Sequence, residues 1–296
     1  MSLVKSFAIG NGDMYYIRHD SDNFSIIDCN LPEDRSGSIL AEIATQSKAK
    51  GITRFISTHP DQDHISGLVD LDDTLGIVNF YCVANNATKD NPTADFKRYR
   101  KLRDDTKKAF YLSKGCTRRW MNQASDERGA SGINILWPVL TDSDYKSALE
   151  DAANGLPPNN ISCIIQYQLK DGVKMLWMGD LETDFMEKIA ANVAIFKVDI
   201  LFAPHHGRDS GKVPVGWLEA MDPGLIVIGE APSEYLNYYS GYDIITQNST
   251  GDILFDCVTG KVHVYVANHN YDADCLDDEG LDHKHGLYYA GTLQAA

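Results

Sequence analysis

The segment from Gly51 to Gly67, which reads GITRFISTHPDQDHISG, limits the possible folds of this chain more than any other part of the sequence. Within it, Ile52 to Thr58 alternates apolar side chains in a β-branched run and predicts a strand that stops at His59. Four side chains that can bind metals follow within six positions: His59, Asp61, Asp63 and His64. A loop that leaves a strand can turn alternate side chains toward one point. We therefore expect the first two ligands to share one ion and the last two to hold a second.

The chemistry of these four side chains suits two divalent ions, zinc or manganese, because both metals accept imidazole nitrogen and carboxylate oxygen. Two ions about 3.5–4 Å apart form the usual clamp of two-metal hydrolases. The aspartates make this set harder than an all-imidazole set, so manganese competes with zinc. The alternative is a polar turn whose aspartates cap a helix beginning near Ile65. Capping explains one carboxylate, but not two aspartates together with two histidines, so we favour the metal site.

The hexad from His59 to His64 resembles the His-X-His-X-Asp-His signature of the metallo-β-lactamase superfamily, with Asp61 where the second histidine usually stands. This variant, followed by Ile-Ser-Gly, looks most like the soluble hydrolase domain of ComEC-type DNA-uptake proteins and their stand-alone relatives. The resemblance spans about Phe7 to Val266. It implies an α/β fold, the four-layer αβ/βα sandwich of two mixed sheets with outer helices, and a site along one edge of the sandwich.

The resemblance also assigns roles to residues that follow later strands. Asp180 comes after the apolar run Val173 to Met178, where the family places an aspartate that bridges two metals. His205 follows the predicted strand Val198 to Ala203 and is expected to bind the second metal. His206 faces another way if this segment is extended, so we expect it to touch the substrate or donate a proton.

The expected site therefore combines metal ligands, catalytic groups and one supporting residue. The expected ligands are His59, Asp61, Asp63, His64, Asp180 and His205. Asp63 and His206 are the expected catalytic residues. Asp28, at the end of the second predicted strand, resembles the family's aspartate that braces the metal loop, and a plain turn aspartate is the alternative.

Three further residues are candidates for contacting the substrate. Arg208 stands where ComEC-type sequences often have serine, and its guanidinium can hold a phosphate while Ser210 adds a hydroxyl. Pairing of Arg208 with Asp209 at the surface is the alternative. Asn160 and Ser162 look similar to the Asn-X-X-Ser pattern of ComEC-type domains. An asparagine in the turn before a strand explains Asn160 equally well.

The charge of the chain is unevenly distributed. The formal net charge is −15, but residues 97–119 contain ten Lys or Arg against two Asp. We expect a basic helical insertion at about residues 90–130, with one helix from Asp95 to Leu112, and an acidic solvated tail at about residues 268–296, all within one domain over residues 1–296. A basic patch on an acidic body can track a phosphate backbone beside the active site. A solvated helix face is the alternative.

The sequence predicts a cytoplasmic protein that makes no membrane contact. No run approaches the ~18 apolar residues that a membrane helix needs, and the first residues lack the apolar core of a signal peptide. The six cysteines lie far apart without a Cys-X-X-Cys pair, which is typical of free thiols in a reducing compartment. The oligomeric state is not predicted.

The expected function is metal-dependent hydrolysis of phosphodiester bonds in nucleic acid by a hydroxide that two metals activate. This expectation combines the analogy with ComEC-type domains, the basic segment and Arg208. A cyclic-nucleotide or dinucleotide phosphodiesterase is one alternative, for which the basic patch and the aromatic loop Ser233 to Tyr242 would suffice. A lactonase or thioesterase would need a more apolar pocket, and a metal-stabilised binding module would act without catalysis.

Overall fold

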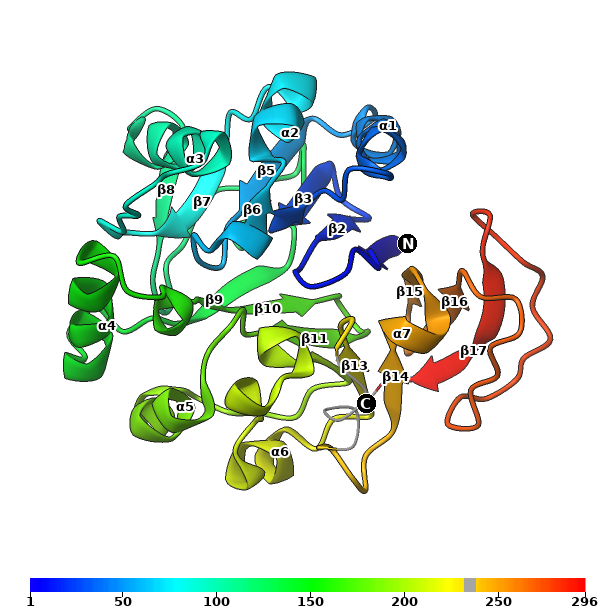
Figure 1. Ribbon diagram of the computed structural model, residues 1–296. Coiled ribbons are helices and arrows are strands. Elements are labelled where there is room, and N and C mark those ends of the chain that lie inside the picture. The colour runs from blue at the N-terminus through cyan, green and yellow to red at the C-terminus, as the bar shows by residue number, and fades with distance from the viewer. Residues whose placement is uncertain (232–237, 296) are drawn as a thin grey trace.

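Two β-sheets pack face to face, and helices cover their outer faces (Figure 1). A computed structural model describes residues 1–231 and 238–295. The aromatic loop expected from Ser233 to Tyr242 therefore lies mostly outside the described residues.

Among the described residues, nine strands form the first sheet, in the order β17-β16-β15-β1-β2-β3-β5-β7-β8. The sheet is mixed, because β3, β5, β7 and β8 pair in parallel and the remaining pairs are antiparallel. Its strands are β1 (Ser2–Ser6), β2 (Tyr15–Arg18), β3 (Asn23–Ile27), β5 (Ile52–Ile56), β7 (Phe80–Val83), β8 (Ala109–Leu112), β15 (Ile253–Val258), β16 (Lys261–Val266) and β17 (Tyr288–Gln294).

In the same described ranges, six strands form the second sheet, in the order β14-β13-β12-β11-β10-β9. It is also mixed, because β11 to β14 are parallel and β9 and β10 run antiparallel to their neighbours. Its strands are β9 (Ile133–Trp137), β10 (Ile164–Gln168), β11 (Lys174–Trp177), β12 (Ile200–Phe202), β13 (Leu225–Ile228) and β14 (Ile244–Thr246). A short parallel pair, β4 (Cys29–Asn30) and β6 (Ile65–Ser66), lies beside the first sheet.

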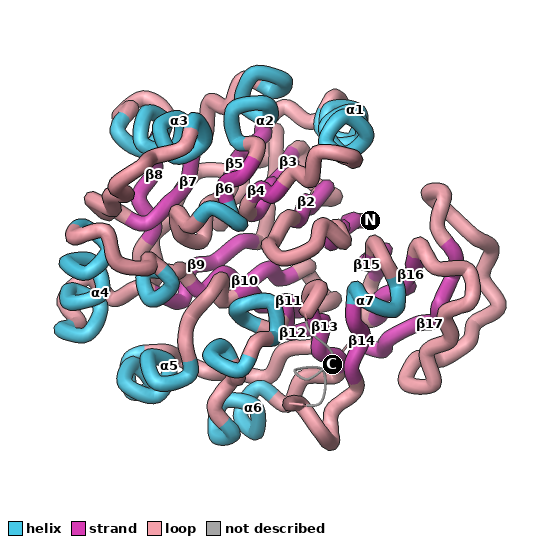
Figure 2. The backbone as a smooth tube through the Cα atoms, viewed as in Figure 1, coloured by secondary structure: helices cyan, strands magenta, loops and turns pink. Residues whose placement is uncertain are grey.

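The helices lie in two outer layers (Figure 2). One layer covers the first sheet with α1 (Ser36–Ser47), α2 (Leu68–Leu75) and α3 (Ala94–Asp104). The other covers the second sheet with α4 (Ser143–Ala153), α5 (Thr183–Ile189) and α6 (Val215–Met221), while the short α7 (Gln247–Thr250) leads from β14 to β15. The four-layer αβ/βα sandwich with two mixed sheets, predicted from the sequence, is confirmed.

Aromatic side chains join the two sheets in the core. The Tyr15 ring of β2 lies edge-on to Phe202 of β12, with ring centroids 5.0 Å apart. Phe202 in turn stacks on Trp177 of β11 at 4.5 Å. All three side chains are at most 5% exposed, and edge-on or stacked ring pairs of this kind stabilise a core beyond the area that they bury. This packing fixes the distance between the two sheet edges from which the site is built.

The helix expected from Asp95 to Leu112 is shorter than predicted. Thr93 caps α3 by accepting a hydrogen bond from the amide of Phe96, and the helix ends at Asp104. Residues 109–112 form β8, which pairs in parallel with β7. Pairing with a neighbouring strand outweighs the local helical pattern, because tertiary contacts routinely override helix propensity. The expected helical insertion therefore contributes an edge strand to the first sheet.

The expected solvated tail is also partly wrong. Residues 288–294 form β17, which pairs with β16 and is the outermost strand of the first sheet. Most side chains between residues 276 and 286 are exposed, as expected for an acidic segment. No helix in the described ranges is long and apolar enough to cross a membrane.

Candidate metal centre

Polar side chains gather at one edge of the sandwich, where strands of both sheets end. Asp28 follows β3, the loop that begins near His59 follows β5, and Asp180 follows β11. His205 and His206 follow β12. In α/β sheets the carboxyl ends of parallel strands are the usual place for ligand-binding residues. The two sheets therefore contribute to one site from opposite sides.

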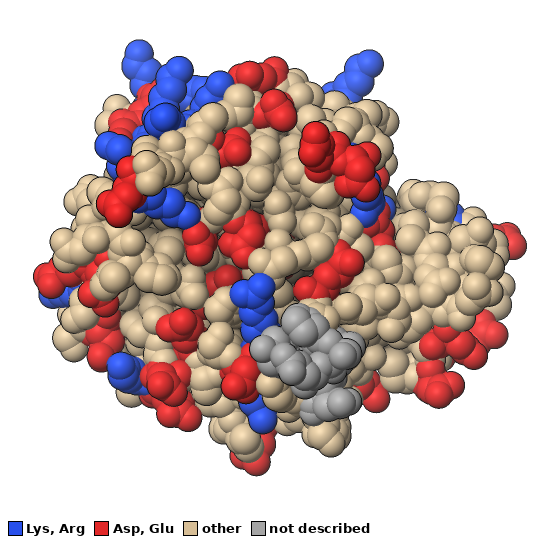
Figure 3. Space-filling view, in the orientation of Figure 1, with Lys and Arg blue, Asp and Glu red and all other residues tan. Residues whose placement is uncertain are grey.

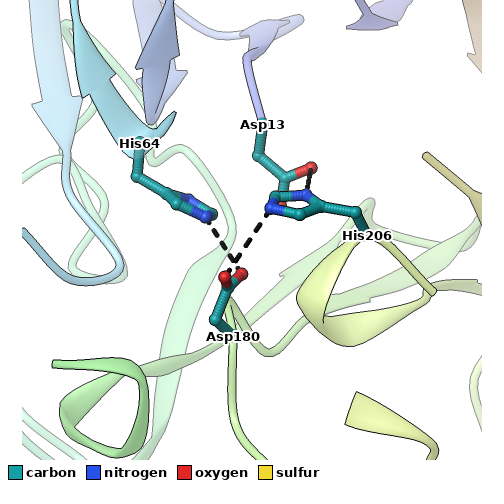
Figure 4. Close-up of side chains that lie close together, drawn as sticks. All are labelled: Asp13, His64, Asp180 and His206. Carbon is teal, nitrogen blue, oxygen red and sulfur yellow. Dashed lines mark hydrogen bonds and ion pairs between the residues drawn. The ribbon is translucent and has the colours of Figure 1, made fainter. Parts of the chain in front are cut away.

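Four buried side chains from four separate segments meet at this edge: Asp13, His64, Asp180 and His206 (Figure 4). One potential ligand atom of each lies within 4.8 Å of the others. The Nε2 atom of His64 is 3.0 Å from Oδ1 of Asp180, and the Nε2 atom of His206 is 3.6 Å from its Oδ2. Asp13 and His64 lie in segments that follow strands β1 and β5 of the first sheet, whereas Asp180 and His206 follow β11 and β12 of the second. Within the described ranges, this is the only group of its kind.

Four imidazoles are oriented toward the Asp180 carboxylate. Besides His64 and His206, the Nε2 atoms of His59 and His205 lie 3.8 Å and 3.6 Å from Asp180 Oδ2. Each of the four rings has its other nitrogen held by an oxygen of the chain. The Nδ1 contacts are His59 to Thr58 Oγ1 (3.1 Å), His64 to Asp28 Oδ2 (2.8 Å), His205 to Ser210 Oγ (2.9 Å) and His206 to Asp13 Oδ1 (3.2 Å). Metal-binding histidines are typically held in this way, because the contact fixes the ring and its tautomer.

The backbone at His205 and His206 explains why both rings reach the same carboxylate. Their φ angles are 52° and 56°, in the left-handed region, and Gly207 follows with a φ of 83°. Non-glycine residues rarely adopt this region, which costs about 1–3 kcal/mol each. The segment is therefore not extended, contrary to the condition under which His206 was expected to face away. His206 is 1% exposed and lies inside the cluster.

Close packing positions Asp180 at the end of β11. Gly179 has a φ of 52°, and a Cβ at this position would lie 2.7 Å from Ser162 Oγ. The amide of Asp180 donates a hydrogen bond to the same Ser162 hydroxyl at 3.1 Å, and the amide of His205 donates to the Gly179 carbonyl at 2.9 Å. A glycine is needed here because both its conformation and the space around it exclude a side chain.

The Asp180 and Asp63 carboxylates are held in their charged form. Burial alone raises the pKa of Asp180, but the surrounding His64, His206 and His59 hold that pKa well below its usual range. Burial likewise raises the pKa of Asp63, yet the nearby His206, 3.4 Å away, and the charge of His64 lower it to about 2. The site therefore places ionised carboxylates among imidazoles, and, against the effect of burial, the same carboxylates raise the pKa of His64 and raise that of His206 to about 10.

A comparison with models of protein families identifies the superfamily of this chain. The family model described as the metallo-beta-lactamase superfamily matches residues 8–165, more than half of the chain. The chain belongs to this superfamily. A search of curated proteins found no match.

Two solved structures are among those that this chain resembles. The metallo-beta-lactamase fold protein YhfI from Bacillus subtilis shares 13% identity, with a TM-score of 0.45 over 83% of this chain and 96% of that one. Igni18, a metallo hydrolase from the archaeon Ignicoccus hospitalis, shares 17% identity, with a TM-score of 0.48 over 86% of this chain and 99% of that one.

The residues present fit the divalent metal that the metallo-beta-lactamase superfamily implies. The Nε2 atoms of His59, His64 and His206 and the Oδ1 atom of Asp180 are buried and make no hydrogen bond, although His64 Nε2 and Asp180 Oδ1 are in ion-pair contact at 3.0 Å. Leaving a buried polar atom without a partner costs about 1–3 kcal/mol, so four of them around one point are unfavourable without a ligand. Imidazole nitrogen and carboxylate oxygen are the donors that such metals prefer.

Two predicted ligands of this superfamily member have other contacts. The Asp61 carboxylate accepts a hydrogen bond from the amide of Gln62 and forms an ion pair with Lys89 at 2.6 Å. Asp63 Oδ2 lies 3.4 Å from His206 Nε2 and also accepts a hydrogen bond from Asn11. The structure thus places Asp63 at the border of the cluster and turns Asp61 toward Lys89.

Asp28 lies where the superfamily resemblance suggested a bracing residue. It is fully buried and accepts hydrogen bonds from the amide and hydroxyl of Thr58, at 2.7 Å and 2.6 Å, while it faces His64 Nδ1. Burial raises the pKa of Asp28, and His64 only partly opposes this effect. Asp28 thereby connects the end of β5 with the metal loop.

The three residues predicted to contact the substrate already make hydrogen bonds within the protein, to different extents. Arg208 donates a hydrogen bond to the Asn11 side chain, and Ser210 holds His205. Asn160 is engaged at both ends of its amide. It donates to Glu182 Oε2 at 2.7 Å and accepts from the Glu182 amide at 3.1 Å. Asn160 therefore orders the turn after Asp180.

The sequence pattern did not single out Asp13 or Lys89 as site residues. Asp13 belongs to the Gly10-Asn11-Gly12-Asp13 loop between β1 and β2, and its carboxylate contacts a histidine 193 positions away. Gly10 and Gly12 were the available signal in the sequence, because glycines permit this loop to approach the loop from His59 to His64 closely. A Cβ on Gly12 would lie 2.5 Å from the Asp63 carbonyl.

Proposed function

We propose that this protein is a phosphodiesterase that cleaves nucleic acid with two divalent ions, zinc or manganese. The observation that carries this proposal is the ring of four imidazole Nε2 atoms around the buried Asp180 carboxylate. When bound, the ions supply Lewis-acid activation of water and stabilise negative charge on the substrate oxygen. The two Asp180 oxygens face different imidazoles, His64 on one side and His206 on the other, so Asp180 would be available as a ligand to the ions together with these histidines.

Asp63 is the proposed proton acceptor for the attacking water. Its side chain is 25% exposed, so one face is open to solvent while Oδ2 stays next to His206. The pKa of about 2 keeps Asp63 ionised at neutral pH, and its hydrogen bond from Asn11 fixes its orientation. A carboxylate placed beside the attacking water can accept its proton as a general base.

Two cations near the metal loop are the proposed anchors for the phosphate. Arg208 reaches Asn11, which in turn holds Asp63. Lys89 pairs with Asp61 on the wall of a cavity of about 240 Å³. Figure 3 shows that acidic side chains otherwise dominate the middle of this face. Because cations are sparse there, these two residues are the ones that attract a phosphate group.

The exposed face of α3 is the proposed track for a longer polynucleotide. Lys97, Arg100 and Lys101 are exposed on this helix, and Lys and Arg gather over α3 at the upper left of Figure 3. Arg98 and Arg103 instead pair with neighbouring aspartates, so the basic surface is smaller than the sequence suggests. The helix begins next to the metal loop, where Thr93 donates a hydrogen bond to Gln62 at 2.9 Å.

We also propose that the protein is similar to ComEC-type hydrolase domains and that it is located in the cytoplasm. The His-X-Asp-X-Asp-His variant supports the first, and six unpaired cysteines support the second. The cavity beside Asp61 favours a second candidate substrate, a cyclic nucleotide or dinucleotide, because its wall carries the Phe96 ring with Lys89 over it.

The decisive experiment incubates the purified protein with single-stranded DNA, double-stranded DNA, RNA and cyclic nucleotides, in added manganese or zinc. Cleavage of polynucleotides that disappears in Asp180→Asn and His64→Ala supports the proposal. Turnover of small nucleotides alone replaces the polynucleotide by the second candidate. Absence of turnover of every phosphodiester, in protein shown to contain metal, overturns the proposal.

The role of α3 has a matched test. The triple substitution Lys97→Glu, Arg100→Glu and Lys101→Glu should weaken polynucleotide binding and flatten its salt dependence, while turnover of a small phosphodiester stays unchanged. The control makes the same change of charge by reversing three exposed lysines elsewhere, Lys48 at the end of α1, Lys146 on α4 and Lys188 on α5. Equal effects of both variants would show that only the total charge matters.

A further inference from the structure

The carboxylates of the metal centre differ in the side chains that they contact. Asp63 and Asp180 contact histidines, and Asp63 also accepts a hydrogen bond from the Asn11 amide. Asp61 instead pairs with a cation, because the Lys89 ammonium lies 2.6 Å from its Oδ1 atom. Among the predicted metal ligands in the described ranges, Asp61 is the only carboxylate with a Lys or Arg partner. The negative charge available to a metal ion is therefore smaller at Asp61 than at the other two carboxylates.

This difference divides the predicted ligands into two groups around Asp180. The His64 side comprises His64, His206 and Asp63. Both of its rings point toward the Asp180 carboxylate (Figure 4). The His59 side comprises His59 and Asp61, which the sequence predicts to share one ion. Because a metal-bound histidine is neutral, Asp61 is the source of negative charge on the His59 side apart from the shared Asp180.

The ion pair between Lys89 and Asp61 can be reached from solvent. Both residues line the cavity of about 240 Å³ beside the metal loop, and their side chains are 25% and 34% exposed. Behind them, the buried Nε2 atom of His59 makes no hydrogen bond. A metal–nitrogen bond of about 2.0–2.1 Å is shorter than a hydrogen bond of about 2.7–3.2 Å, so an ion fits against this nitrogen where a water molecule does not.

Lys89 weakens the attraction of Asp61 for a metal ion. The Oδ1 atom of Asp61 takes both of its contacts, the amide of Gln62 at 2.7 Å and the Lys89 ammonium at 2.6 Å. An ion that binds through the other oxygen therefore shares the carboxylate with a positive charge. Like charges separated by a few ångströms repel each other even in water, and the repulsion is doubled when one of them is divalent.

The Lys89 side chain can leave Asp61 without a movement of its loop. The preceding residue, Thr88, is fixed to the end of α4, because its amide donates to the Ala152 carbonyl at 3.0 Å and its hydroxyl donates to the Ala153 carbonyl at 2.9 Å. Lysine has a flexible four-carbon stem, and exposed side chains change rotamer within nanoseconds. An anion in the cavity can therefore draw the ammonium away from Asp61.

We propose that Lys89 couples the binding of an ion on the His59 side to the binding of a phosphate group in the adjacent cavity. Without substrate, the ammonium neutralises Asp61, and the His59 side holds its ion weakly. A substrate phosphate pairs with the ammonium and leaves Asp61 to the ion. By linkage, the ion then strengthens phosphate binding by the same factor. This inference rests on the proposed two-ion phosphodiesterase, but it concerns binding and does not require turnover.

The test measures manganese bound to the purified protein by equilibrium dialysis and metal analysis, with thymidine 5′-monophosphate, with thymidine and without either. We expect one tightly bound ion and one weakly bound ion. Thymidine 5′-monophosphate should raise the affinity for the weakly bound ion about tenfold, which is the size of effect expected for one charge-assisted contact. Thymidine, which lacks the phosphate group, should leave this affinity unchanged.

Two substitutions identify the residues responsible. Lys89→Met keeps an unbranched side chain against the Phe96 ring but removes the charge. It should bind the second ion about tenfold more tightly without nucleotide and should lose the response to thymidine 5′-monophosphate. Asp61→Asn should lose the weakly bound ion and keep the tightly bound one, because the His64 side is unchanged.

The matched control is Lys197→Met. Lys197 also pairs with an aspartate, Asp222, at 2.9 Å, but it precedes β12, whereas His205 and His206 follow that strand. This variant removes the same charge away from the metal centre and should bind both ions like the unmodified protein.

Three results would overturn the proposal: a second ion that never binds, equal manganese affinities in the unmodified protein and Lys89→Met, or two ions retained in Asp61→Asn. The phosphodiesterase proposal fails on a different result, the absence of phosphodiester cleavage by metal-loaded protein, so the two failures are distinguishable.

Discussion

The ammonium group of Lys89 lies 2.6 Å from Oδ1 of Asp61, so the carboxylate at the second position of the histidine-aspartate hexad is paired with a cation. The same ammonium lies 5.5 Å from the centre of the Phe96 ring, which restrains the lysine side chain. Asp61 is 34% exposed, and this pair is open to solvent on one side. An incoming phosphate group can therefore contact Lys89 without entering the buried cluster.

Lys89→Gln should weaken substrate binding without removing the metal. We expect KM for a small phosphodiester to rise about tenfold, because one charge-assisted contact to the phosphate is lost. Steady-state kinetics and metal analysis of the purified variant check this, with Lys188→Gln on the exposed surface of α5 as the control. A loss of bound metal with unchanged KM would instead give Lys89 the role of ordering the metal loop.

Asp28→Asn should lower the metal affinity about 10–100-fold, because the variant cannot hold His64 Nδ1 with a charged oxygen. Competition with a chelator of known affinity measures the change. Asp256→Asn is the matched control, since Asp256 is also completely buried but lies on β15 and has no hydrogen bond to its carboxylate oxygens. If both variants lose metal equally, burial of the carboxylate rather than its contact with His64 is responsible.

Gly179→Ala should destabilise the fold more than the loss of a left-handed glycine alone. Gly76 provides the comparison, because its φ is 64° and its added Cβ would meet no atom within 4 Å. Gly76→Ala should cost about 1 kcal/mol, whereas Gly179→Ala adds the contact with Ser162 and should cost about 1–3 kcal/mol more. Urea unfolding of both variants gives the two free energies of unfolding. Equal values would mean that the Asp180 turn relaxes freely.

His19 makes the stability of the protein depend on pH. Burial lowers its pKa well below the ordinary value of 6.5, so below that pH the unfolded chain binds a proton that the folded chain does not. Above pH 6.5 His19 is neutral in the folded and the unfolded chain, so it does not change the free energy of unfolding. Below pH 6.5 the unfolded chain takes up the proton, and the free energy of unfolding falls by up to about 1.4 kcal/mol per pH unit until the folded pKa is reached. Urea unfolding at several pH values should show a shallower decline for His19→Gln than for the unmodified chain. Parallel curves would contradict a neutral buried His19.

Local sequence patterns were sufficient to place a metal ligand where that residue directly follows a predicted strand. The period-two run before His59 and the apolar run before Asp180 predicted strands, and β5 and β11 lie there. Because ligands in such sheets gather at the carboxyl ends of strands, the edge that carries the site followed from these two positions.

Three other features depended on contacts that a local pattern does not contain. The left-handed backbone at His205 and His206 brings His206 into the cluster, and no periodicity in the sequence indicates that conformation. Asp13 reaches His206 from the other sheet, so its position requires the packing of the sandwich. The strand at residues 109–112 forms because β7 lies beside it, although the preceding residues favour a helix.

The side chains around Asp180 come from both sheets, and this has a consequence for unfolding. His64 follows a strand of the first sheet, while Asp180 and His206 follow strands of the second, so an ion held among them would cross-link the two halves of the sandwich. Because the unfolded chain has no such arrangement of donors, the free energy of metal binding adds to the free energy of unfolding. The availability of the metal would then set not only the activity of the protein but also its lifetime in the folded state.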